Sequence, residues 1–149
     1  MSTFRRRSHR GQAMVEFALI LPIFILVLVG IFDMGRAVYD YNVISNAARQ
    51  AIRLAIVDQN TTKITNKAVQ HATGIAGVGD VTVSFLNGAT ATSYTQCSAA
   101  PTGCKLGWYA VVKVSYDYTA ATPVLGNLLG TIHMTSTSKQ AIESVYTSP

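Results

Sequence analysis

An uninterrupted apolar segment near the N-terminus is the strongest feature of the hydrophobic pattern. Residues 13–32 carry a single charge, that of Glu16, and residues 17–32 carry none. Twenty helical residues span about 30 Å, which matches the hydrocarbon core of a bilayer. The pattern predicts a transmembrane helix over residues 12–32. Pro22 removes one backbone donor and is expected to kink this helix.

The helical period continues through residues 33–57, where one face is apolar or small and the opposite face is polar or basic. The apolar stripe consists of Tyr41, Ile44, Ala48, Ala51 and Ala55, and the polar face of Asn42, Asn46, Arg49 and Arg53. We therefore expect one helix from about Ala13 to Val57. Its amphipathic second half would present the small-residue stripe to a folded domain.

Residues 58–149 contain shorter periodic segments separated by turn signals. A second helix is expected from Lys63 to about Thr73, with Thr61 or Thr62 as its N-cap. Alternation of apolar and polar residues predicts strands. The expected strands are residues 81–85, 108–118 and 131–141. The predicted fold class is α+β, with the long N-terminal helix packed against a small antiparallel sheet of three or four strands and a second short helix.

Basic charge is concentrated ahead of the apolar segment. The net charge is +5, but residues 5–10 supply four of the twelve basic residues, and the chain beyond Gly11 is nearly neutral. A basic arm before a span follows the positive-inside rule and places the N-terminus in the cytoplasm. A nucleic-acid-binding protein would spread its basic groups over a folded face, so no nucleic acid is expected as a partner.

Two cysteines, Cys97 and Cys104, enclose six residues that include Pro101 and Gly103. The predicted topology places them outside the cytoplasm, where disulfides persist, so we expect a disulfide between them. Two cysteines without a nearby histidine give too few ligands for a metal site. No catalytic motif is found, and neither a metal, a cofactor nor an enzymatic activity is expected.

The N-terminal residues resemble those of type IV pilins, and more narrowly those of the TadE-like proteins of Tad (Flp) pilus systems. The basic arm is followed by Gly11, then by Glu16 at the fifth position after it, and then by an apolar helix. Further similarities are the Glu16-Phe17-Ala18 run, the Leu21-Pro22 pair, Asp33-Met34-Gly35-Arg36 and the segment 47–53. Gln12 is polar, whereas major pilins have an apolar aromatic residue there, and this favours the minor-pilin branch.

The resemblance implies a processed structural subunit, a minor pilin or pseudopilin. A prepilin peptidase would cut between Gly11 and Gln12, which makes residues 1–11 a leader and leaves residues 58–149 as an extracytoplasmic domain. The expected location is the bacterial inner membrane, with a single span, and later the pilus at the cell surface. The implied partners are the peptidase, other pilin subunits, inner-membrane pilus assembly proteins and membrane lipid.

The same resemblance assigns Glu16 a role in assembly. Cleavage would free the α-amine of Gln12, and in the family the glutamate is thought to pair with such an amine on a neighbouring subunit. Pairing relieves the cost of a carboxylate in a low-dielectric medium. The alternative is that Glu16 lies among the lipid headgroups and has no role.

Two other functions fit the same predicted fold. One is an unprocessed single-span membrane adapter, and the other is an anchored extracellular binding module whose activity resides in the loop between Cys97 and Cys104. Adhesion, secretion and DNA uptake are not distinguished by the sequence.

Overall fold

The computed structural model describes residues 9–75, 80–90, 94–95, 104–122, 126–127 and 130–145. The helices are α1 (His9–Ala55) and α2 (Thr61–His71). The strands are β1 (Val81–Leu86), β2 (Tyr94–Thr95), β3 (Tyr109–Thr119) and β4 (Thr131–Ala141). They form an antiparallel sheet in the order β2-β1-β3-β4. The predicted α+β arrangement is confirmed.

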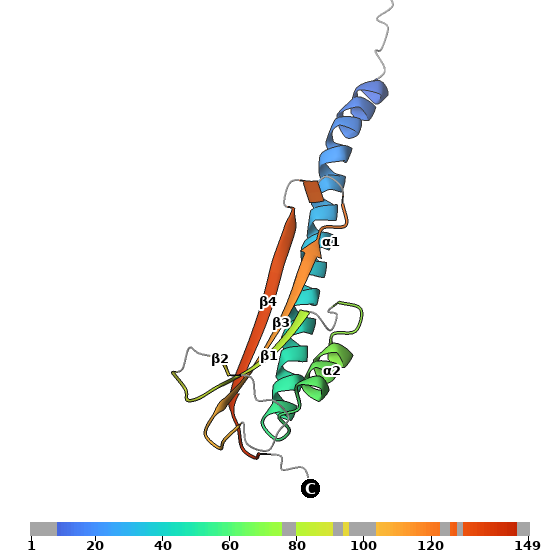
Figure 1. The fold of residues 1–149 in the computed structure, drawn as a ribbon. Helices are drawn as coiled ribbons and strands as arrows, with labels where there is room; N and C mark the ends of the chain where they lie inside the picture. The colour runs from blue at the N-terminus through green and yellow to red at the C-terminus, as the bar shows by residue number, and fades with distance from the viewer. Residues whose placement is uncertain are drawn as a thin grey trace, which may run out of the picture.

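Helix α1 has two halves with different surroundings (Figure 1). The N-terminal half projects away from the domain, whereas β3 and β4 lie alongside the C-terminal half. The 23 residues from Asp33 to Ala55 rise about 33 Å, and an 11-residue strand such as β3 is about as long. The β3–β4 hairpin therefore follows α1 over its whole domain half.

The core lies between α1, α2 and the sheet. Four alanines of α1 are fully buried beside Ile44. These alanines are Ala47, Ala48, Ala51 and Ala55. Their small side chains allow the sheet and α2 to approach the helix closely. The predicted stripe is confirmed except at Tyr41, which is 49% exposed. Tyr41 lies about 60° around the helix from Ile44, at the edge of the buried face.

Helix α2 is shifted by two residues from the prediction, and the predicted N-cap is wrong. The cap is Asn60, whose side-chain oxygen accepts a hydrogen bond from the backbone N–H of Lys63 at 3.2 Å. An asparagine side chain bonds to the N3 amide in this way as readily as a threonine does. Ile64 and Ala68 are buried against the core, as predicted.

Strand β3 has the predicted alternation. Ala110, Val112 and Val114 are fully buried on the face toward α1, whereas Lys113 and Asp117 are exposed on the other face. Strand β4 exposes hydroxyl side chains, as its Thr/Ser-rich sequence indicates. Strand β2 was not predicted, because two residues are too few to show a period.

Candidate functional site: the projecting half of α1 and its junction with the domain

The predicted cleavage and assembly residues all lie in the first turns of the projecting half of α1. Gly11, Gln12 and Glu16 are exposed there. The side-chain amide of Gln12 donates a hydrogen bond to Glu16 Oε1 at 3.3 Å. A neutral amide leaves the carboxylate charge uncompensated, so Glu16 remains available to a cation supplied from elsewhere.

Glycine at position 11 is not required by the fold. A Cβ atom added there would meet no other atom within 4 Å, and the backbone is not in the left-handed region. Gly35, in the domain half of α1, is equally unconstrained. Neither glycine is therefore explained by packing within the described part of the chain.

The apolar segment of α1 is exposed to its surroundings. Within the part of the chain that the structure describes, α1 is the one helix long and apolar enough to cross a membrane, and none of its most apolar 18-residue window is buried. The N-terminal apolar helix thus fits a single membrane span. The α-helix is continuous through Pro22, and the expected kink stays a prediction.

Asp33, the first residue after the apolar segment, joins α1 to the end of the β3–β4 hairpin. Its side chain is buried, with Oδ1 accepting from the Ala121 amide at 3.2 Å and Oδ2 accepting from the Thr122 hydroxyl at 2.7 Å. Its backbone carbonyl accepts from the buried Tyr118 hydroxyl at 2.8 Å. We call these four residues the junction; they fix the hairpin where the projecting half begins.

The hydrogen bond from the Thr122 hydroxyl is the main reason why the pKa of Asp33 is lower than usual, although burial opposes it. The Ala121 and Thr122 amides and the nearby Arg36 lower the pKa further. Burial, helped by the charge of Asp33, raises the pKa of Tyr118. Asp33 is therefore a carboxylate and Tyr118 a neutral donor at neutral pH, as the hydrogen bonds require.

Arg36 lies one turn after Asp33 and places its guanidinium carbon 5.9 Å from the centre of the Tyr118 ring. This is within the range of a cation–π contact. The Asp33-Met34-Gly35-Arg36 sequence thus has a structural explanation: Asp33 holds Tyr118 and Thr122, and Arg36 lies over the same tyrosine.

The domain end of α1 has a second attachment. Gln59 donates its side-chain amide to the carbonyls of Ser144 at 2.8 Å and Ala55 at 3.3 Å. The amides of Glu143 and Ser144 donate to the Ile56 carbonyl. The residues after β4 are thereby tied to the end of α1, opposite the junction.

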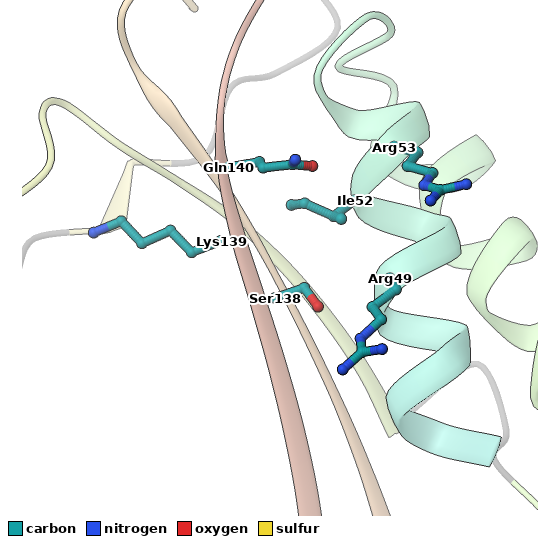
Figure 2. Close-up of a pocket in the computed structure, with 6 residues that line it drawn as sticks. All are labelled: Arg49, Ile52, Arg53, Ser138, Lys139 and Gln140. Carbon is teal, nitrogen blue, oxygen red and sulfur yellow. The ribbon is translucent and has the colours of Figure 1, made fainter. Parts of the chain in front are cut away.

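An open hollow lies between α1 and β4 (Figure 2). It is lined by Arg49, Ile52, Arg53, Ser138, Lys139 and Gln140. Lys139 points away from the two arginines, and its ammonium donates to the Ala89 carbonyl at 2.6 Å. The hollow therefore presents two exposed guanidinium groups and no acid–base pair.

The remaining predicted site residues are the two cysteines. Cys104 is buried beside the core, and Cys97 lies outside the described residues, so the disulfide stays a prediction. Among the described residues no group of three or more histidines, cysteines and acids is placed to hold a metal ion.

A bare apolar half-helix continuous with a helix that carries an α+β domain fits the class of proteins with a single N-terminal membrane span. Within this class, residues 11–53 match the family model described as TadE-like protein. The resemblance indicated by the N-terminal motifs is confirmed over this segment, which lies entirely within α1. Comparison with curated proteins and with solved structures gives no match.

The junction is the part of the site that sequence reasoning missed. The sequence identifies Asp33 and Arg36 as motif residues and helical neighbours, but not their partners in the sheet. Those partners, Tyr118, Ala121 and Thr122, lie more than 80 positions further along the chain. A local signal existed, since an aspartate directly after an apolar segment needs a partner. Which residues become the partners of Asp33 depends on the register of the sheet against α1.

Proposed function

We propose that this chain is a TadE-like minor pilin or pseudopilin, a structural or priming subunit of a Tad-type pilus. It is inserted into the bacterial inner membrane with its N-terminus in the cytoplasm, and a prepilin peptidase cuts it after Gly11. The helix 12–32 then holds it in the membrane until other pilin subunits and the assembly proteins take it into the filament.

The observation that carries this proposal is the family match over residues 11–53, which includes the scissile glycine and Glu16. The geometry supports it, because both residues are exposed on a half-helix that projects from the domain and are accessible to an enzyme or a neighbouring subunit. The absence of any packing reason for glycine at position 11 supports recognition by a peptidase.

The test is the N-terminal residue of the protein purified from membranes of cells with and without the peptidase. We expect Gln12 only when the peptidase is present. Gly11→Leu should remain uncut, whereas the matched control Gly35→Leu, at another glycine with open space around it, should be cut normally. A chain that begins at Met1 in both strains contradicts the proposal and identifies an unprocessed adapter.

A further inference from the structure

A band of apolar and aromatic side chains on α1 lies beyond the predicted span and is covered by no part of the described chain. We call Met34, Val38, Tyr39 and Tyr41 the collar. They are 72%, 57%, 65% and 49% exposed. Clustered apolar exposure of this kind marks a surface that meets lipid or another protein.

We propose that the collar lies in the lipid headgroup layer on the domain's side of the membrane, so that the junction end of the domain rests on the bilayer. This inference rests on the membrane anchoring in the proposed function and adds the depth at which the domain sits. The occupant of the collar is the phospholipid surface of the membrane that α1 crosses.

The length of the apolar surface supports this placement. The exposed apolar face of α1 runs without a break from the predicted span into the collar and ends at Tyr41, after which Asn42, Asn46 and Arg49 follow. The distance from Ala13 to Tyr41 is about 42 Å of helix. A bilayer with both headgroup layers is about 40–45 Å thick, whereas its hydrocarbon core alone is about 30 Å.

The types of side chain in the collar also change along α1 in the order expected from the lipid core to the water. Aliphatic side chains give way to Tyr39 and Tyr41, and tyrosines are enriched where one end of a side chain is in lipid and the other in water. Arg36 is exposed at the same level, and its guanidinium, which lies over the Tyr118 ring, places a positive charge at the height of the lipid phosphates.

The acidic groups at this level are shielded from lipid by the domain itself. Asp33 and Asp40 are both buried on the side of α1 that faces the sheet, and Asp33 is bonded by Ala121 and Thr122. The junction therefore removes a carboxylate from the lipid-facing surface at the level where the span enters the headgroup layer.

A second copy of α1 is the rival occupant, and the shape of the collar argues against it. At 100° per residue, its four side chains cover roughly 160° of the helix circumference. The apolar seam that a helix uses against one partner in a coiled coil is narrower than the stripe of about 100° or more with which a helix faces a whole core. Lipid covers a helix from all free sides and requires no particular crossing geometry.

The test uses the full chain in phospholipid vesicles with a benzophenone amino acid in place of Tyr39 or, as the control, of Asn46. Both positions are exposed, and they lie two turns apart on the same face of α1. After illumination, mass spectrometry identifies the adduct. We expect phospholipid adducts at position 39 in at least five-fold greater yield than at position 46.

Equal yields of lipid adduct at the two positions overturn the proposal, and so does a dominant adduct with a second copy of the chain at position 39.

A second measurement uses Tyr39→Trp and Asn46→Trp in a Trp108→Phe background, with vesicles brominated near the headgroup. Stronger quenching at position 39 supports the proposal, and equal quenching contradicts it. Cleavage after Gly11 is scored separately, so failure of the collar and failure of the proposed function are distinguishable.

Discussion

Asp33 determines how the sheet is attached to α1, and Glu16 determines what the free half of α1 can pair with. The two carboxylates lie 17 residues apart on one helix, but their environments differ. Asp33 is buried and accepts two hydrogen bonds from the end of the β3–β4 hairpin. Glu16 is exposed and accepts one from a neutral amide. The first is satisfied within the chain, and the second is available to a group outside it.

Replacement of Glu16 tests its availability to other subunits. Glu16→Gln keeps the size of the side chain and removes the charge, so we expect normal insertion and cleavage but at least a tenfold loss of the protein from sheared pilus fractions. The neighbouring change Gln12→Asn is the control and should assemble. Normal assembly of Glu16→Gln would mean that the glutamate has no pairing role.

Replacement of Asp33 tests the junction. In Asp33→Asn the negative charge is lost and one of the two accepting oxygens becomes an NH2 donor, so the full chain in detergent should melt roughly 2–8 °C lower. Thr122→Val should lower the melting temperature similarly, and the double variant should lose less than the sum, since both changes break the same bond. Simple additivity would show that Asp33 and Thr122 do not interact.

The junction also predicts a pH dependence. The pKa of Asp33 is lowered in the folded state, chiefly by the Thr122 hydroxyl. Its stabilisation is therefore complete above the unfolded-state pKa, and it is lost as the pH falls through the lower folded-state pKa. Urea unfolding between about pH 6 and pH 3 should show a smaller loss of stability for Asp33→Asn than for the natural chain. Equal losses would contradict the assignment.

At the scale of elements, the alanine stripe determines how closely the sheet packs on α1. Ala51 is fully buried in the core between α1, α2 and the sheet, so a larger side chain would have to displace its neighbours. Ala51→Leu should lower the free energy of unfolding by about 1–3 kcal/mol. The control Asn46→Leu, on the exposed face, should change it by less than about 0.5 kcal/mol. Chemical denaturation of the full chain in detergent measures both.

The elements differ in how well the sequence predicted them. Strand β4 was predicted at its observed bounds and β3 to within one residue, because alternation over 11 residues is a strong signal. The N-cap of α2 was wrong because Asn60, Thr61 and Thr62 are all good caps, and the choice depends on where the chain leaves α1. Tyr41 was placed in the core because a helical wheel does not show how far around the helix the sheet extends.

At the scale of the whole molecule, the domain is attached to α1 at two distant points. The junction at Asp33 lies at one end of the shared length, and Gln59 with the Ile56 carbonyl lies at the other. The hairpin between them runs parallel to the helix axis (Figure 1). This arrangement makes the domain half of α1 and the sheet a single body, from which the apolar half projects.

Two separate attachments predict independent contributions to stability. Asp33→Asn and Gln59→Ala act at opposite ends of the length that α1 shares with the hairpin, so their effects on the free energy of unfolding should add in the double variant. Each single variant should melt several degrees lower, roughly in line with the loss of a buried hydrogen bond. A double variant that loses much more than the sum would show that the two ends are coupled through the hairpin.

The sequence by itself determined the apolar half of α1, the continuation of the helix, the two long strands and the motifs of the TadE-like match. These features follow from local periodicity and from residues close together in the chain. Only the tertiary structure decided the junction, the burial of Asp40 and the exposure of the collar. Each depends on which strand lies against which turn of α1, and that placement is set by packing between segments more than 80 residues apart.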